Sequence, residues 1–358
     1  MKMKKSTFAI VLFFYHLVFV LISYQYYVTK GGDAPLYWHT TNYSHHKSWV
    51  YFLNYGTDFI LFLNYPFIKL GLPLWFGFLL YGCIGFFGIL KWMQWAEQVF
   101  GSPVSYKGIY ILWVVLLFPS LHFWTAALGK EPLVFWGIAS VFYALTIQKY
   151  NTFSFIAGSL LLIVIRPHVA LMLLLAAVLV LVFQKKYSLR FRLILATAAV
   201  SVFGALCYMV LQITKIRYLD WNRIRYYNEY SILSFKNSGG YVPMLDYTYF
   251  YRLFSFNFRP LFFEVQSVFG FFSAAENTLL LLLYGLALLI VIRYYPKIVF
   301  PAWMQITFLF VLIASLLYIQ RYANFGIFMR TKIMYQPFAV IALFCIIKQG
   351  LSLHKTTT

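Results

Sequence analysis

The sequence predicts an all-α protein, a polytopic transmembrane helical bundle of about ten spans with interfacial helices on its outer face. Hydrophobic residues make up 62% of the 358-residue chain and charged residues only 11%, whereas soluble domains carry about 25% charged residues. Apolar runs close to the length that crosses a bilayer recur from end to end. Aromatic residues reach 22%, and many stand at the ends of these runs, as in interfacial belts. We therefore expect a single integral membrane domain over 1–358.

The first apolar run follows the basic start MKMKK directly. It is longer than the core of a signal peptide and has no small-residue cleavage site, so it predicts a retained first span. Two outer segments are long: 29–72, which contains the apolar stretch TDFILFLNYPFIKLG and is expected to hold an interfacial segment, and 215–271, a long loop rich in Arg and Tyr. The predicted spans are 7–28, 73–92, 109–128, 132–149, 152–165, 169–184, 192–214, 272–293, 302–320 and 331–348.

Basic residues near the span ends orient the chain. The lysines of MKMKK place the N-terminus in the cytoplasm, and alternating the spans returns the C-terminus to the same side. The cluster KKYSLRFR supports this orientation most strongly. Many Lys and Arg residues nevertheless fall on the outer face, although basic residues in short loops normally stay on the cytoplasmic side of a membrane. Either the topology differs in part, or these cations are retained for function.

The net charge of +20 does not predict nucleic-acid binding, because the cations are scattered among short loops. Anionic lipid head groups, topology signals and phosphate-bearing substrates explain this charge better. The three cysteines lie in apolar runs and indicate neither a disulfide framework nor a metal site. The sequence also lacks the GxxxxGK[ST], HExxH and GxSxG motifs, so ATP-driven transport and zinc-peptidase chemistry have no support.

The first polar group of interest is Asp33, in GGDAPLYWH just after the first span. A carboxylate there can act as a general base or orient a substrate. The alternative is a purely structural Asp at the start of a helix, which Ala-Pro directly after it also favours. Tyr37 and His39 follow as candidate substrate contacts. His39, His45 and His46 can join Asp33 in binding a metal, but their spacing is generic, so we predict no metal site and no cofactor and leave a divalent metal open.

Two hairpin turns between apolar runs carry further charges. In WTAALGKEP, Lys130 and Glu131 suit either a phosphate-binding lysine held by an acid or a plain polar turn at a helix start. In IRPH, Arg166 can bind phosphate as a bidentate fork and His168 can relay a proton, although Pro167 is equally consistent with a simple turn.

A third turn, QRYANFGIFMRTKIMYQP, precedes the last span. Arg321 and Arg330 bracket it, with Lys332 beside the second. Cations near a membrane surface can simply extend towards water. Three of them on the outer face favour an anionic ligand instead.

Together these groups predict an outer-facing cleft with cations, carboxylates and aromatic rings. Cations suit phosphate or pyrophosphate, and aromatic faces suit the C–H surface of a sugar. A lipid tail suits the membrane setting. A polyprenyl-phosphate-linked sugar combines all three features.

The Asp-x-x-x-Tyr arrangement of Asp33 and Tyr37 resembles that of membrane glycosyltransferases of the C superfamily (GT-C). The turns WTAALGKEP, IRPH and NFGIFMRTKIMYQP also resemble those of uncharacterised multi-span proteins from bacterial surface-polysaccharide gene sets. The resemblance implies a bacterial inner (plasma) membrane protein that moves a sugar from a polyprenyl-phosphate-linked donor to a glycan acceptor on the extracytoplasmic side, with an acidic residue of the first outer loop in catalysis. Membrane lipid and other glycan-assembly proteins are the further partners expected.

The mechanism expected from these residues is inverting transfer. Asp33 activates the acceptor hydroxyl, His168 assists, and Lys130, Arg166, Arg321 and Arg330 hold the donor phosphate. Three other functions remain open, of which a non-catalytic membrane scaffold is disfavoured because charges cluster on the outer face. In a polysaccharide polymerase or ligase that uses a pyrophosphate-linked glycan, arginines and a histidine would carry the chemistry. A lipid-linked sugar flippase or transporter is disfavoured because the sequence shows no internal repeat.

Overall fold

The computed structural model describes residues 5–39, 47–101, 105–106, 109–110, 115–185, 187–214 and 220–357. These residues are mostly helical, and the β-structure among them is an antiparallel pair of two-residue strands, β1 (Ser105–Tyr106) with β2 (Ile109–Tyr110), and an isolated bridge. The all-α class is confirmed. The chain packs as two compact units, Met1–Ala170 and Leu171–Thr358, and the boundary falls within α10 (Pro167–Val182). Whether the units form one membrane domain stays a prediction.

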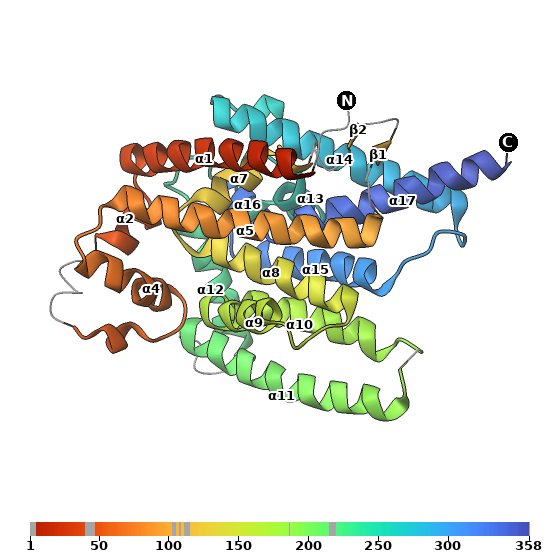
Figure 1. Cartoon of the computed structure of the whole chain (residues 1–358), viewed down its shortest axis with the longest axis horizontal. Helices are drawn as coiled ribbons and strands as arrows, with labels where there is room; N and C mark the ends of the chain where they lie inside the picture. The colour runs from red at the N-terminus through yellow and green to blue at the C-terminus, as the bar shows by residue number, and fades with distance from the viewer. Residues whose placement is uncertain are drawn as a thin grey trace. The chain divides into compact units, whose positions relative to one another are not determined.

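Long helices packed side by side form the first unit. The helix α5 (Leu74–Phe100) contacts α8 (Lys130–Ile147) along its length, α8 contacts α9 (Phe153–Ile165), and α1 (Lys5–Lys30) packs on α5 and on the short α7 (Pro119–Ala126) (Figure 1). Small elements join α1 to α5 and pack on each other: α2 (Asp33–Trp38), the 3-10 turn η1 (Trp49–Phe52) and α4 (Thr57–Lys69).

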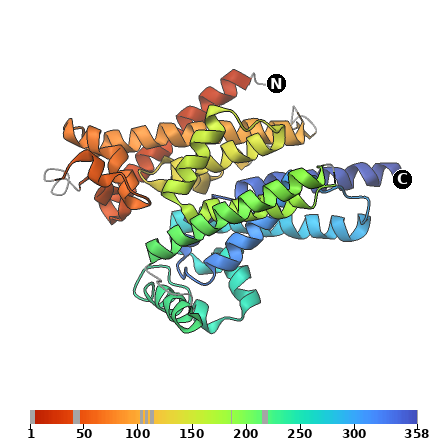
Figure 2. The same ribbon diagram turned by 90° about the horizontal axis from the view of Figure 1, so that it is seen from below.

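The second unit begins with the rest of α10, followed by α11 (Leu189–Thr214) and α12 (Trp221–Leu233). Its core is formed by α14 (Val268–Tyr294), α15 (Ala302–Tyr318) and α17 (Gln336–Thr357), with α17 against both partners (Figure 2). The helices α13 (Tyr249–Phe258) and α16 (Phe325–Lys332) close this core, because α13 contacts α14, α15 and α16. Two 3-10 turns flank α13: η2 (Met244–Asp246) and η3 (Phe262–Glu264).

Within the described part of the chain, five helices are long and apolar enough to cross a membrane: Thr7–Lys30, Leu74–Phe100, Leu189–Tyr208, Val268–Tyr294 and Gln336–His354. Three shorter apolar helices, α9, α10 and α15, match predicted spans in position but have 10–17 residues each. A length of about 20 residues is needed to cross the bilayer without tilting or thinning it. The coarse prediction of an integral membrane protein is supported, and the count of about ten spans is not confirmed.

The predicted span 109–128 is not one continuous helix. The helical backbone breaks at Phe118, and α7 starts afresh at Pro119, which lacks the N–H that a continuing helix needs. With eight residues, α7 is far too short to cross a bilayer alone. Instead it is buried, and it fills the space beside α1 and α5.

The two segments predicted as long outer loops contain helices. Between residues 29 and 72 these are α2 and α4, and α4, with 13 residues, is too short to span. In the described part of 215–271, α13 is a core element, because Ser255, Phe256 and Asn257 are buried. The alternation of aromatic and polar residues along α13 hides its role, since its buried face includes Ser and Asn. An interfacial position for any of these helices stays a prediction.

Glycines set how closely α5 approaches α7. A Cβ added at Gly85 would lie 1.8 Å from the backbone oxygen of Thr125. We therefore expect Gly85→Ala to force the two helices apart and to lower the free energy of unfolding by about 3 kcal/mol. The matched control is Gly285→Ala on α14, where nothing lies within 4 Å of the new atom, and where a small gain from reduced chain entropy is expected. Thermal midpoints in detergent check this, and equal midpoints for the two variants would contradict the close approach.

Candidate functional site

The start of α8 brings together charged groups from distant parts of the sequence. Gly129 precedes Lys130 and Glu131, and a Cβ at Gly129 would lie 3.3 Å from Glu131 Oε2 and 3.6 Å from the ring of Tyr37. The missing side chain therefore lets the Glu131 carboxylate and the Tyr37 ring approach the same point. Tyr37, Lys130, Glu131 and Arg166 are called the Glu131 cluster below.

Arg166 binds Glu131 through a buried ion pair between Nη2 and Oε1. The exposed fractions of the two side chains are 11% and 3%. Arg166 is the single residue between α9 and α10. Its N–H donates to Leu162 O (3.0 Å) and its carbonyl accepts from Val169 N (2.9 Å). Because Pro167 starts α10 and fixes the local backbone, the arginine is aimed by the junction of two helices.

Lys130 lies beside this pair on the same helix turn, and its side chain is half-buried. Its Nζ donates to Thr57 Oγ1 (2.9 Å), at the start of α4. The same end of α4 is tied to α9, because Gly56 N–H donates to Val164 O (2.8 Å). The starts of α4 and α8 and the end of α9 therefore meet at the Glu131 cluster.

Tyr37 reaches the Glu131 cluster from α2, where its side chain is buried. Its carbonyl accepts from Asn64 Nδ2 (3.1 Å), and Asn64 Oδ1 accepts from the hydroxyl of Tyr81 (2.9 Å). This chain of bonds fixes α2 between α4 and α5. Sequence analysis did not single out Asn64, although a lone amide within the apolar stretch of 57–70 is a detectable signal.

Asp33 is the first residue of α2 and is exposed. It stands four residues before Tyr37, so the two share one face of the helix. A carboxylate in the first turn also suits the positive end of the helix dipole. His39 is exposed and caps the C-terminal end of α2. Asp33 therefore lies one helical turn from a member of the Glu131 cluster.

His168 is half-buried in the first turn of α10, two residues beyond Arg166. Sequence analysis thus predicted an Arg and a His flanking a proline, and both belong to one helix junction. His45 and His46 lie outside the described residues. Among the residues that are described, no three His, Cys, Asp or Glu side chains come together.

Arg321 and Arg330 belong to the second unit. Arg321 follows α15, and its Nη2 donates to the hydroxyl of Tyr227 on α12 (2.7 Å), with the guanidinium 5.0 Å from the ring centre. Arg330 is half-buried near the end of α16. That these arginines share one cleft with Lys130 and Arg166 stays a prediction.

Lys332 ends α16 and is buried. Its Nζ donates to Asn277 Oδ1 (2.6 Å), Asn257 O (3.2 Å) and Arg259 O (3.3 Å). These three acceptors match the three donors of an ammonium group. Burial lowers the pKa of Lys332 to about 7, and the charge of Glu276 opposes part of that shift.

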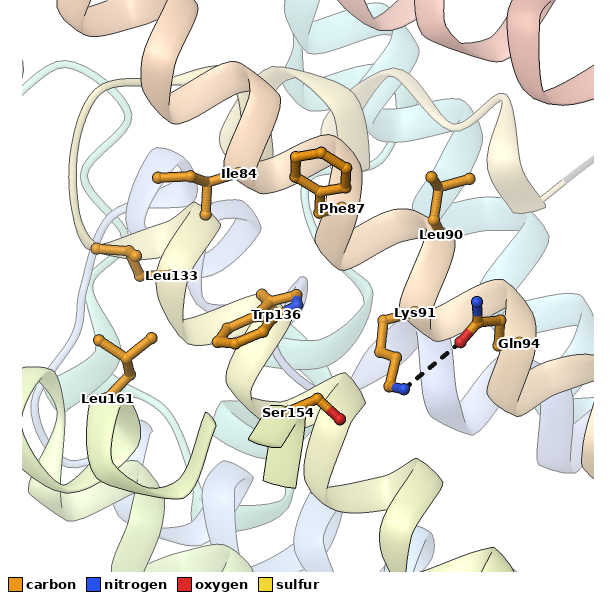
Figure 3. Close-up of a pocket in the computed structure, with 9 residues that line it drawn as sticks. All are labelled: Ile84, Phe87, Leu90, Lys91, Gln94, Leu133, Trp136, Ser154 and Leu161. Carbon is orange, nitrogen blue, oxygen red and sulfur yellow. Dashed lines mark hydrogen bonds between the residues drawn. The ribbon is translucent and has the colours of Figure 1, made fainter. Parts of the chain in front are cut away.

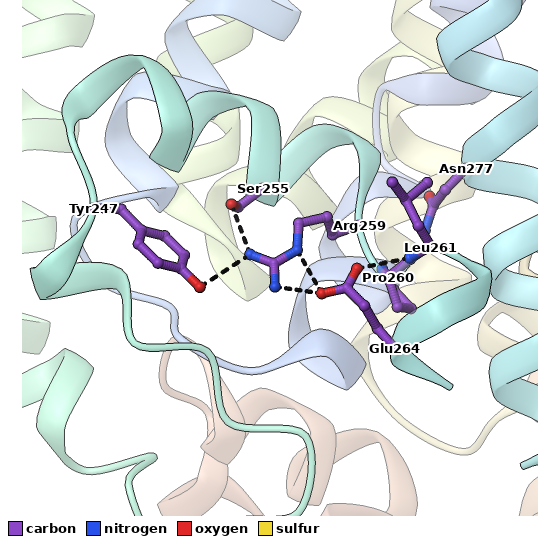
Figure 4. A network of polar contacts seen from close by, with 7 residues as sticks. All are labelled: Tyr247, Ser255, Arg259, Pro260, Leu261, Glu264 and Asn277. Carbon is purple, nitrogen blue, oxygen red and sulfur yellow. Dashed lines mark hydrogen bonds and ion pairs between the residues drawn. The ribbon is translucent and has the colours of Figure 1, made fainter. Parts of the chain in front are cut away.

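Arg259 is held in a second polar network after α13 (Figure 4). Its Nε donates to Glu264 Oε1 (2.7 Å), which also accepts from Nη2, and its Nη1 donates to Ser255 Oγ (3.0 Å) and Tyr247 Oη (3.3 Å). Glu264 Oε2 in turn accepts from Leu261 N (2.8 Å). Burial disfavours the guanidinium charge, but the bonds and charges of Glu264 and Tyr247 outweigh it and raise the pKa of Arg259.

Sequence analysis missed these two networks, whose carbonyl and amide partners come from α13, α14 and the turn between them. The detectable signal was Glu276 and Asn277, an acid and an amide inside the apolar run 272–293, where polar groups are costly. Arg259 and Lys332 donate their hydrogen bonds to other groups of the protein. Their first role is therefore to hold α13, α14 and α16 together.

Two cavities lie elsewhere in the two units. One of about 550 Å³ lies between α5, α8 and α9 (Figure 3), and one of about 360 Å³ lies between α13, α14 and α15. Neither is lined by a residue of the Glu131 cluster. Comparisons with known protein families, with curated proteins and with solved structures give no match to this chain.

Breaking the Arg166–Glu131 pair should be costly. Glu131→Gln removes the carboxylate that pairs with the largely buried guanidinium of Arg166, and breaking a buried pair typically costs about 3–5 kcal/mol. The matched control is Glu229→Gln on α12, which breaks the exposed Arg225–Glu229 pair, worth about 0.3–0.5 kcal/mol. Thermal midpoints in detergent measure both, and similar losses in the two variants would contradict a buried pair.

The buried Lys332 predicts how stability depends on pH. Its pKa is about 7 in the folded chain and about 10.4 when unfolded. The unfolded chain therefore binds more protons between these values, and stability through this group rises with pH by up to about 1.4 kcal/mol per unit. Below pH 7 both states are protonated and the dependence ends.

We expect Lys332→Met to remove this rise while lowering stability overall, because it leaves the three acceptors without their donor. Thermal midpoints of both proteins from pH 6 to pH 10 check this. A wild-type curve parallel to that of the variant would show that Lys332 keeps its ordinary affinity for protons.

Proposed function

We propose that this chain is an integral membrane glycosyltransferase of the bacterial plasma membrane. It transfers a sugar from a polyprenyl-phosphate-linked donor to a glycan acceptor on the extracytoplasmic side. The observation that supports this most is the Glu131 cluster. Folding brings two cations, a carboxylate and an aromatic ring together at one end of the first unit, with Asp33 one helical turn away.

Each group has a part in the proposed reaction. Lys130 and Arg166 bind the donor phosphate, and Glu131 keeps the guanidinium of Arg166 in position. Tyr37 offers a ring against which a sugar can pack. Asp33, the exposed carboxylate, is the proposed general base, and His168 assists in positioning the acceptor.

The chemistry is a single displacement. Asp33 takes the proton of the acceptor hydroxyl as its oxygen bonds to the anomeric carbon of the sugar. The bond from that carbon to the phosphate oxygen breaks, and the lipid phosphate leaves with the electron pair. Lys130 and Arg166 stabilise the charge that develops on this phosphate. The anomeric configuration is inverted.

A polysaccharide polymerase or ligase is the second candidate. It is favoured by the IRPH junction, because Arg166 is fixed by a carboxylate and His168 follows within one turn. In that case Arg166 and His168 would carry the reaction and Asp33 would only start α2.

Asp33→Asn tests the proposed base. In membranes that contain the full chain, with a panel of radiolabelled polyprenyl-phosphate sugars and a glycan acceptor, we expect the rate to fall by about 10²–10⁴-fold. Asp246→Asn, an exposed acid in the second unit, is the control and should keep the wild-type rate. Lys130→Gln should instead raise KM for the donor, whereas Lys69→Gln should not.

Full activity of Asp33→Asn would remove the base assignment. If His168→Ala and Arg166→Lys then abolished product formation with pyrophosphate-linked glycans, the polymerase or ligase function would replace the proposal.

A further inference from the structure

The cavity of about 550 Å³ in the first unit is polar at one end and apolar along the rest (Figure 3). Its walls come from α5, α8 and α9. Lys91, Gln94 and Ser154 lie together, and the remaining lining side chains are Ile84, Phe87, Leu90, Leu133, Trp136 and Leu161. This division matches a molecule with a charged head and a hydrocarbon body.

Lys91 supplies the charge. Its Nζ lies 3.5 Å from Gln94 Oε1, the outer limit of a hydrogen bond, and 4.0 Å from the centre of the Tyr143 ring. The described residues offer it no carboxylate within ion-pair distance. A half-buried ammonium group whose partners are a ring and one long hydrogen bond keeps its charge available to an anion.

The start of α9 adds to the positive end. Ser154 is in the first turn of that helix, where backbone N–H groups point out of the helix end. Its hydroxyl lines the cavity on the side across from α5. Lys149 is exposed in the turn just before α9. One lysine, Lys91, therefore lies with a hydroxyl and a helix start at one end of an apolar groove.

This end is separate from the Glu131 cluster. That cluster lies where α8 begins and α9 finishes, whereas Lys149 and Ser154 lie where α8 finishes and α9 begins. At 1.5 Å per residue, α8 alone separates them by about 25 Å, close to the thickness of the hydrocarbon core. In the predicted topology, the two sites therefore lie on opposite sides of the membrane.

We propose that this groove binds one anionic glycerophospholipid. One of its acyl chains lies along Phe87 and Leu161, and the head-group phosphate contacts Lys91 and Ser154. The charge selects an anionic lipid over a zwitterionic one, because the described groove offers no acid to pair with a choline or an ethanolamine. The apolar wall selects a lipid over free phosphate. The predicted topology also agrees with an anionic lipid. It places Lys91 on the cytoplasmic side, and the cytoplasmic leaflet carries anionic lipids that attract basic residues.

Native mass spectrometry of the purified full chain tests this inference, with titration of dioleoyl phosphatidylglycerol and dioleoyl phosphatidylcholine. We expect one phosphatidylglycerol to bind roughly fivefold to tenfold more tightly than phosphatidylcholine, as for one or two lysines near a lipid surface. Lys91→Gln should abolish this preference, and Lys69→Gln, an exposed lysine of the same unit, should keep it.

A second variant protects the test against misfolding. Ser154→Glu places a negative charge at the head-group end without altering Lys91, and it should also abolish the preference. Wild-type preference in a folded Lys91→Gln or Ser154→Glu variant would overturn the inference.

Two competitors define the ligand. Inorganic phosphate should not displace phosphatidylglycerol, and a polyprenyl phosphate should not bind more tightly through Lys91. Displacement by phosphate would reduce the groove to an anion site, and tighter polyprenyl phosphate binding would make it a substrate site. Either result would overturn the phospholipid assignment. Because glycosyl transfer is not measured, the outcome is independent of the proposed function.

Discussion

The buried ion pair between Arg166 and Glu131 is the contact on which the charged end of the first unit depends. A carboxylate and a guanidinium cannot lie apart in an apolar interior without a large cost in free energy. Their pairing therefore fixes the start of α8 against the junction of α9 and α10. Next to this junction, Lys130 donates a hydrogen bond to Thr57 at the start of α4, and the Tyr37 ring lies close to Gly129. The proposed site and the packing of four helices follow from one constraint.

The second unit meets the same constraint differently. There Lys332 donates hydrogen bonds to two backbone carbonyls and a side-chain amide. Arg259 donates to Glu264, Ser255 and Tyr247. Cations that are saturated in this way hold helices together, whereas the half-buried Lys91 lines a cavity that a ligand can enter. The contrast separates structural cations from candidate binding groups, and residue type alone does not make that distinction. It also places the two ligand proposals of the first unit at opposite ends of α8 and α9.

Sequence analysis anticipated part of the candidate site. Lys130, Glu131 and Arg166 were singled out from two turns that interrupt apolar runs, and the structure pairs Glu131 with Arg166. The reason is physical, since charged residues in short turns between buried helices must find partners at the helix ends. That these residues bind a substrate stays a prediction. Asn64, Glu276 and Asn277 were missed because each is a single polar residue inside a run whose average hydropathy is high. Their importance depends on which backbone carbonyl or side chain they contact, and that is a property of the packed chain.

Hydropathy and composition by themselves determined the helical class and the membrane setting, because both depend on local averages of side-chain character. They did not determine where helices stop. The break at Phe118 and the role of α13 as a core helix were decided by packing, which admits short helices where longer ones fill the remaining space. Only the tertiary structure joined Glu131 to Arg166 and placed Lys91 across a groove from Ser154. Contacts between residues far apart in the sequence leave no local pattern, so the fold alone decides them.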